Sequence, residues 1–239
     1  MKINWTPLKV IVLAFIIVGL YGFSNYRSAK KEIEDIEIKF LGDNNLYLTE
    51  DAVNKMLIQN HGSVKNQSRD AIVLNTIEEV IETNAMVKQA QVYLTVNGEL
   101  ISEIELKKPI ARIEVGSSFY LDDSGKQMPL SKFHSARVPL ITGKVSGEAL
   151  KDCYEILEYI NQDDFLRKNV VGIHIEDIGS YLLKLRVDAF ELRLGGVEDL
   201  NQKFKNFMAF YLKAKKDKTL TQYTTVSLEF DNQVVCTKK

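Results

Sequence analysis

The three histidines are the side chains best suited to hold a metal ion or to carry a proton, but their spacing favours neither role. His61, His134 and His174 are scattered along the chain, with no partner at the i, i+4 spacing that places two ligands on one helix face. The two cysteines, Cys153 and Cys236, are too far apart in sequence for a zinc or redox pair. The sequence therefore predicts no metal centre and no cofactor.

Neighbouring carboxylates could act as general acid and base, and two such pairs occur. Asp122–Asp123 lies in a segment with the composition of a hairpin turn, and Asp163–Asp164 has no pocket of converging groups to suggest catalysis. Gly195–Gly196 lacks the third glycine and the lysine of a phosphate-binding loop, so a tight turn is predicted there. Since no nucleophile elbow or Ser-x-x-Lys motif is present, the sequence predicts a protein that is not an enzyme.

The charge balance gives no global attraction to nucleic acid, because 31 Lys and Arg residues face 32 Asp and Glu residues. The one basic cluster, KAKKDK over residues 213–218, could touch anionic lipid, although the solvated end of a helix explains it more simply. Cys153 lies on the apolar face of a predicted helix, where a buried thiol is expected. The sequence leaves both alternatives for Cys153 and Cys236, a disulfide between them or two free thiols. No nucleic acid and no small-molecule substrate is expected.

The most apolar stretch of the chain runs from Leu8 to Phe23 (LKVIVLAFIIVGLYGF), with Lys9 as its only charge. As a helix these residues span about 24 Å, and extension through Tyr26 gives about 28 Å, close to the ~30 Å hydrocarbon core of a bilayer. Aromatic residues stand near both ends of the stretch, which suits the two membrane interfaces. We expect one membrane-spanning helix over residues 9–26.

This interpretation leaves a short cytoplasmic tail (residues 1–8) before the anchor and a polar linker (residues 27–32) after it. A buried core helix is one alternative, but Val10–Leu20 has no polar stripe. A cleaved signal peptide is another, for which Gly22-Phe23-Ser24 is a poor cleavage site. The positive charges on the two sides are balanced, so orientation follows from the short tail, which we expect to stay in the cytoplasm.

Residues 33–108 show the order strand, helix, helix, strand, strand. Thr49 and the acidic residues after it begin the first helix, and Gly62 ends it. Asn97–Gly98 is the strongest two-residue hairpin signal in the chain. The predicted strands are Ile33–Phe40, Gln91–Val96 and Glu99–Leu106, and the second helix covers about Ile72–Thr83.

Residues 109–239 alternate strands and helices and predict a mostly antiparallel β-domain flanked by helices. The predicted helices are Leu150–Ile160 and Val197–Leu212, and the predicted strands are Val170–Glu176, Tyr181–Val187, Phe190–Leu194 and Thr224–Phe230. The whole chain is therefore expected to be an α+β protein with an N-terminal transmembrane helix.

The β-α-α-β-β order resembles a POTRA domain, a protein-binding module. A POTRA domain after an N-terminal anchor, followed by Lys108-Pro109-Ile110-Ala111-Arg112, resembles the FtsQ/DivIB family of bacterial cell-division proteins. The chain departs from the family pattern at Leu106, where Glu or Gln is common, and at Ser227-Leu228-Glu229, where Asp-Leu-Arg is frequent. Further segments that resemble family motifs are Phe119–Gly125 (FYLDDSG), Met128-Pro129-Leu130, Val138–Gly143 (VPLITG) and Leu192–Gly195 leading into Lys203.

The resemblance implies a non-enzymatic scaffold in the inner membrane, single-pass and type II, with its C-terminal domain in the periplasm at the division septum. The implied partners are other divisome membrane proteins, namely small coiled-coil single-pass subunits and the septal peptidoglycan synthesis complex. In the family, the β-domain binds the small subunits through its C-terminal sheet edge, and the POTRA domain contributes to recruitment.

A sheet edge can bind a partner by accepting its strand, because the unpaired N–H and C=O groups of the edge strand continue the ladder. Thr224–Phe230 is the last predicted strand, so we expect it at the edge with Ser227 facing outward; a fully internal strand is the alternative. Added bulk in Ser227→Trp is then expected to abolish partner capture without unfolding the domain. The predicted partner-binding residues are Tyr223, Thr225, Ser227, Glu229 and Phe230.

Other functional classes have distinct requirements. A POTRA-containing transport or envelope-assembly component should carry several POTRA repeats, and no repeat is visible in this sequence. A membrane-tethered hydrolase needs a pocket with converging titratable groups. A membrane-bound sensor needs a cytoplasmic portion that can signal, which a short tail cannot supply.

Overall fold

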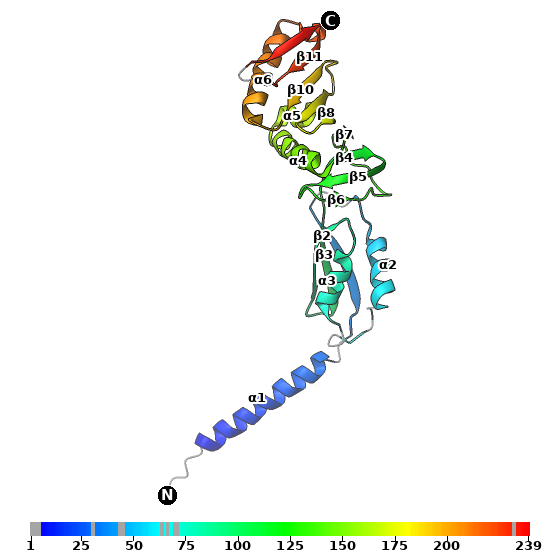
Figure 1. The fold of residues 1–239 in the computed structure, drawn as a ribbon. Coiled ribbons are helices and arrows are strands. Elements are labelled where there is room, and N and C mark those ends of the chain that lie inside the picture. Colours follow the sequence, from blue (N-terminus) through cyan, green and yellow to red (C-terminus); the bar gives the residue numbers. More distant parts are fainter. Residues whose placement is uncertain are drawn as a thin grey trace. The chain divides into compact units, whose positions relative to one another are not determined.

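The computed structural model describes residues 6–29, 32–42, 46–62, 65, 67–68, 72–230 and 233–239. The chain divides into two compact units, Met1–Leu106 and Lys107–Lys239, which are coloured along the sequence in Figure 1. Residues 1–5 of the predicted tail and 30–31 of the predicted linker lie outside the described residues.

The first helix, α1, runs from Thr6 to Ala29 and includes all of the predicted anchor. Its large apolar side chains are exposed; Phe15 is 76% and Val18 68% accessible. Over the part of the chain whose placement is described, no helix combines the length and the apolar character that a bilayer crossing requires.

The rest of the first unit has the predicted order of strand, helix, helix, strand, strand. Its elements are β1 (Asp35–Leu41), α2 (Glu50–His61), α3 (Leu74–Glu82), β2 (Val87–Leu94) and β3 (Glu99–Leu106). The central strand is β3, which is parallel to β1 and antiparallel to β2. Strands β1 and β2 therefore form the two edges of this small sheet.

Local sequence signals act in this unit as predicted. The N–H of Ala52 donates to Thr49 Oγ1 at 3.3 Å, so Thr49 caps α2. In the β2–β3 hairpin, the N–H of Thr95 donates to the carbonyl oxygen of Glu99 at 2.9 Å, and Gly98 adopts a φ of 104°, which favours glycine. The largest fully buried apolar side chains of the unit are Ile33, Leu57, Ile81, Leu100 and Ile104.

The second unit contains one nine-stranded sheet in the order β12-β11-β10-β9-β8-β7-β4-β5-β6. Its strands are β4 (Pro109–Val115), β5 (Ser117–Asp122), β6 (Gln127–Met128), β7 (Leu140–Gly143), β8 (Val170–Asp177), β9 (Ser180–Leu185), β10 (Glu191–Gly195), β11 (Tyr223–Ser227) and β12 (Val235–Lys238). Five of the eight strand pairs are antiparallel and three are parallel, which agrees with the predicted mostly antiparallel sheet.

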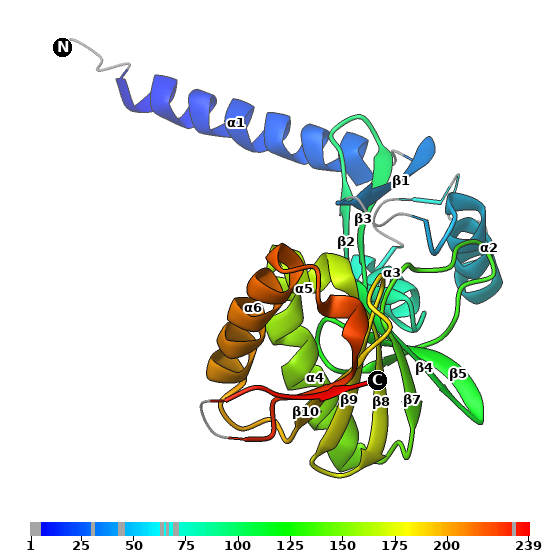
Figure 2. The same ribbon diagram turned by 90° about the horizontal axis from the view of Figure 1, so that it is seen from above.

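The helices of the second unit are α4 (Gly147–Gln162), α5 (Asp164–Asn169), α6 (Leu200–Lys216) and the short 3-10 helix η2 (Leu220–Gln222). Figure 2 shows α4 and α6 side by side on one face of the sheet. Alternate strand residues such as Ile173, Leu183 and Leu192 are buried on that face with Ile156 and Phe207 of the helices. This alternation is the period-2 pattern of a sheet with one covered face.

Several elements differ from their predicted bounds or were not predicted at all. Helix α6 begins at Leu200 instead of Val197, after a turn in which Asp199 adopts a left-handed φ of 52°. Strands β4, β5, β6, β7 and β12 have no counterpart among the predicted strands. Strand β11 ends at Ser227, so the last residues of the predicted strand Thr224–Phe230 leave the sheet.

Candidate partner-binding site

Strand β11 is internal, which corrects the prediction that it forms the edge of the sheet. It pairs in parallel with β10, where Thr225 lies opposite Glu191. On its other side it pairs antiparallel with β12, where Val226 lies opposite Cys236. The prediction is wrong because Val235–Lys238 form one more strand, which pairs with β11 on the side that was expected to be open.

The free edge of the sheet at this end is therefore β12. The N–H of Lys239 and the carbonyl oxygen of Thr237 both bond toward the β11 side, at 2.9 and 3.2 Å. Because backbone groups alternate in direction along a strand, Cys236 and Lys238 point their N–H and C=O groups away from β11. The C-terminus lies at this rim of the domain (Figure 1).

The predicted partner-binding residues occupy different environments around this edge. Tyr223 is half-buried, and its ring packs edge-on against Phe210 of α6 at a centroid distance of 5.5 Å. Thr225 is also half-buried in the middle of β11. Phe230 lies beyond the end of the strand with 48% of its surface exposed. The aromatic anchor most available to a partner is therefore Phe230, whereas Tyr223 supports the domain.

Ser227 is buried, with only 7% of its surface exposed, so its predicted outward and accessible position is wrong. Its Oγ donates to Glu229 Oε2 at 2.9 Å and accepts the Glu229 N–H at 3.3 Å. Arg193 of β10 and Val235 of β12 lie opposite it on the two sides. Glu229 itself is exposed. The serine therefore fixes the turn that leaves β11.

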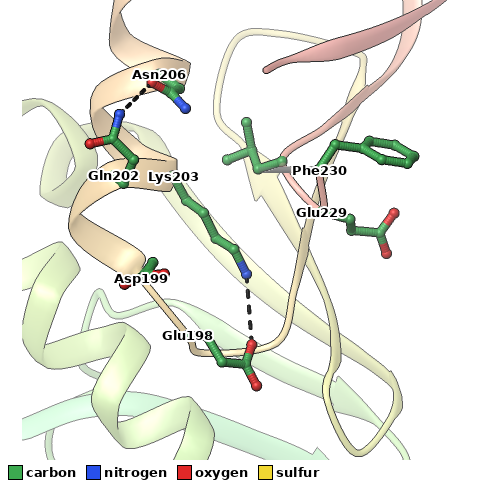
Figure 3. Close-up of a pocket in the computed structure, with 8 residues that line it drawn as sticks. Glu198, Asp199, Gln202, Lys203, Asn206, Glu229 and Phe230 are labelled. Atoms are coloured by element: carbon green, nitrogen blue, oxygen red, sulfur yellow. Dashed lines mark hydrogen bonds and ion pairs between the residues drawn. The ribbon is translucent and has the colours of Figure 1, made fainter. Parts of the chain in front are cut away.

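A groove of about 470 Å³ lies beside this turn, against the start of α6 (Figure 3). The Nζ of Lys203 donates to the carbonyl oxygen of Gly196 at 2.8 Å and lies 3.9 Å from Glu198 Oε2. The side chain of Lys203 is only 16% exposed, and its ammonium group holds the Gly195–Gly196 segment, which was predicted to be a tight turn. The lining residues are Glu198, Asp199, Gln202, Lys203, Asn206, Leu228, Glu229 and Phe230.

The chemistry of this groove is that of a polar surface. Its charged lining residues are Glu198, Asp199, Lys203 and Glu229, and the described lining includes no serine, cysteine or histidine. A second groove, of about 510 Å³, lies between α4 and the β5–β6 hairpin. Its Ser124 hydroxyl donates to Asp122 Oδ1 at 2.7 Å, and its Tyr154 hydroxyl lies 3.1 Å from the carbonyl oxygen of Asp123. Both hydroxyls serve the turn.

The carboxylate pairs singled out in the sequence have structural roles. Asp122 Oδ1 accepts the N–H groups of Ser124 and Lys126 at 2.9 and 2.8 Å, which closes the predicted hairpin turn. Asp163 Oδ1 accepts the N–H of Leu166 at 2.8 Å and caps α5. These contacts engage Oδ1 of Asp122 and Oδ1 of Asp163, each within a local turn or cap.

The histidines whose side chains the structure describes are His134 and His174. His174 Nδ1 lies 2.9 Å from Thr142 Oγ1 on the exposed face of the sheet. The side chain of His61 lies outside the described residues, although the residue ends α2. Among the residues that the structure describes, no three His, Cys, Asp or Glu side chains form a metal-binding group.

Three ionisable groups with raised pKa values lie in the core of the second unit. Both cysteines are free thiols, and burial raises the pKa of Cys153 to about 12. Burial and the hydrogen bond to Asp188 raise the pKa of Tyr211 to about 12. Burial and a hydrogen bond to Asp152 likewise raise the pKa of Tyr181. Each of these groups stays protonated near neutral pH, so none is an activated nucleophile.

Sequence reasoning missed the residues of β12 as the edge. The signal was present in Asp231–Asn232, a turn dipeptide followed by Val234–Val235, which is typical of a hairpin. The dipeptide itself lies outside the described residues. The edge residues are Val235, Cys236, Thr237 and Lys238.

Two protein-family models match this chain. A family model for the POTRA-like domain matches residues 32–105. A second model, described as FtsQ/DivIB, C-terminal related, matches residues 108–237, which is more than half of the chain. The search of curated proteins gave no match. With the POTRA-like domain and the strand-rich C-terminal domain in this order, the chain belongs to the FtsQ/DivIB family of cell-division proteins.

Proposed function

We propose that this protein is a non-enzymatic, membrane-anchored scaffold that binds other membrane proteins of the bacterial division machinery by accepting a partner strand at β12. The observation that carries the proposal is the free edge of the nine-stranded sheet, where β12 has a neighbour on one side only. Membership of the FtsQ/DivIB family supports a role in cell division, and the free β12 edge supports binding by strand addition.

An added strand would find both parts of a docking surface at β12. The outward N–H and C=O groups of Cys236 and Lys238 offer main-chain hydrogen bonds, which give affinity. Val235 is 42% and Phe230 48% exposed, so two apolar side chains flank the turn between β11 and β12. Exposed aromatic and apolar side chains next to an open edge are typical anchors of an interface.

The residues predicted from the sequence keep a place in this proposal. Glu229 and Phe230 are exposed beside the edge and would contact the partner directly. Three of the predicted residues lie on β11, which pairs with β12 and not with the docking strand itself: Tyr223, Thr225 and Ser227. They would act indirectly, by holding β12 in register. We propose that the partners are small coiled-coil single-pass subunits and, through them, the septal peptidoglycan synthesis complex.

A membrane tether is part of the proposed function. Helix α1 has 24 residues. Its large apolar side chains between Val10 and Leu20 are exposed and are not packed against other described residues. We propose that α1 anchors the protein in the inner membrane, with the POTRA-like domain and the second unit in the periplasm. Tethering would raise the effective concentration of partners held in the same membrane, so weak strand contacts would suffice.

The test removes one outward donor of β12. Lys238→Pro deletes the N–H that faces the open edge, whereas Lys238→Ala deletes the side chain and keeps the N–H. We expect cells depleted of the native protein to filament, the Ala variant to restore division, and the Pro variant to fail although it accumulates in folded form. Normal division supported by Lys238→Pro would contradict strand addition at this edge.

A further inference from the structure

The POTRA-like sheet also has a free-standing edge strand, β2, which belongs to the first unit. In the β2–β3 hairpin the N–H of Thr95 points to β3 and donates to the Glu99 carbonyl oxygen. Because the direction of backbone groups alternates, Ala90 and Val92 point their N–H groups away from β3, to the open side. An open edge of this kind is a template for a strand from another chain.

Two glutamates of α3 accept hydrogen bonds from these outward N–H groups. The N–H of Val92 donates to Glu78 Oε1 at 2.7 Å, and the N–H of Ala90 donates to Glu82 Oε1 at 3.0 Å. Glu78 and Glu82 are four residues apart, so they lie on one face of the helix, and the two amides are two residues apart, so they lie on one side of the strand. The match of the two spacings gives each amide its own carboxylate.

These contacts are strong and well placed for closing the edge. Hydrogen bonds from N–H groups to ionised carboxylates are about twice as strong as those between neutral groups. The side chains of Ala90 and Val92 are buried, at 5% accessibility each, so α3 lies over the same part of β2 that its glutamates cap. A partner strand that paired with β2 here would have to displace both carboxylates.

We propose that Glu78 and Glu82 form a carboxylate latch that closes the β2 edge to strand addition by a second copy of this chain. The latch makes the β2 edge unlike the β12 edge. At β12 the outward groups are free of such side-chain contacts among the described residues, whereas at β2 two outward donors are already used. This inference does not depend on the role proposed for β12.

The test opens the latch and asks whether a strand then binds. The probe is a synthetic peptide with the β2 sequence VKQAQVYL in which a benzophenone group replaces the second glutamine, added to the full chain in detergent micelles. The variants are Glu78→Ala/Glu82→Ala and, as the matched control, Glu79→Ala, which removes an exposed carboxylate from the same helix. Cross-links are mapped by mass spectrometry to residues 87–94.

We expect cross-links within residues 87–94 to rise at least tenfold in the double variant and to stay at the wild-type level in Glu79→Ala. Equal yields in the wild type and a folded double variant would overturn the latch. A second measurement uses the wild type alone: the amides of Ala90 and Val92 should exchange with deuterium at least tenfold more slowly than those of Cys236 and Lys238. Exchange at equal rates would overturn the proposal even if the double variant failed to fold.

Discussion

Ser227 of β11 lies directly opposite Val235 of β12, and this antiparallel pairing moves the free edge of the sheet from β11 to β12. The same serine faces Arg193 on its other side, so it has backbone neighbours on both flanks. A partner cannot pair with β11 without first removing β12. The consequences for mutagenesis differ from those expected of an edge residue.

Ser227→Trp is predicted to destabilise the second unit instead of only blocking a partner. The serine is 7% exposed, and a large ring in its place would overpack its buried surroundings on that face of the sheet. The free energy of unfolding should fall by about 1–3 kcal/mol. Urea unfolding followed by circular dichroism measures it, with Thr237→Trp on the exposed strand β12 as the control. A Ser227→Trp protein as stable as the wild type would contradict this placement.

Gly143→Ala is predicted to be among the most damaging small substitutions in the chain. Gly143 adopts a φ of 97°, and a Cβ atom there would lie 2.1 Å from the carbonyl oxygen of Ile175. Strain and overlap together should cost about 3 kcal/mol of unfolding free energy. Gly147→Ala is the control, because a Cβ there meets open space at the first residue of α4. Equal stability of the two variants would be the contrary result.

Lys203→Ala is predicted to destabilise the turn that precedes α6. The variant leaves the carbonyl oxygen of Gly196 without the donor that lies 2.8 Å away in the wild type. Loss of a hydrogen bond from a charged group should lower the free energy of unfolding by about 1.5–3 kcal/mol. Lys205→Ala, from an exposed position on the same helix, should change it by less than about 0.5 kcal/mol. Chemical denaturation of the two variants in parallel gives the comparison.

Alkaline pH is predicted to destabilise the second unit through its buried acids. Cys153 keeps its proton in the folded state up to a pKa of about 12, whereas its ordinary value is 9.0. Between these values the unfolded chain has released the proton and the folded chain has not, so stability falls as the pH rises. The slope is at most about 1.4 kcal/mol per pH unit for this group. Melting temperatures from pH 8 to 11 should therefore fall less steeply in Cys153→Ala; an unchanged slope would contradict the assignment.

Local signals in the sequence predicted much of the fold because their causes are local. The Thr49 cap, the Asn97–Gly98 hairpin and the Asp122 turn each depend on residues within five positions of one another. Gly143 combines a local and a distant cause, because its φ is positive and a Cβ atom there would meet the backbone of Ile175 on β8. The helix bounds shifted by a few residues: α4 begins at Gly147 instead of Leu150, and α6 begins at Leu200, after Asp199 adopts a left-handed conformation.

The features that the sequence did not predict depend on contacts between distant residues. Strand β6 has two residues and β7 has four, too few for a period-2 pattern to stand out. Strand β12 is also short, and its effect on β11 follows from pairing and not from composition. The Glu78–Val92 contact joins a helix side chain to a strand amide 14 positions away, and no periodicity encodes it.

Site-specific photo-cross-linking at position 238 tests the central claim most directly. A photoreactive amino acid replaces Lys238 at the β12 edge in the full chain, in dividing cells, and Lys184, exposed on the internal strand β9, is replaced in the control. The account predicts an adduct with another division protein at 238, mapped to an extended segment of that partner, and none at 184. Adducts of equal yield at both positions, or at 184 alone, would contradict partner binding at β12.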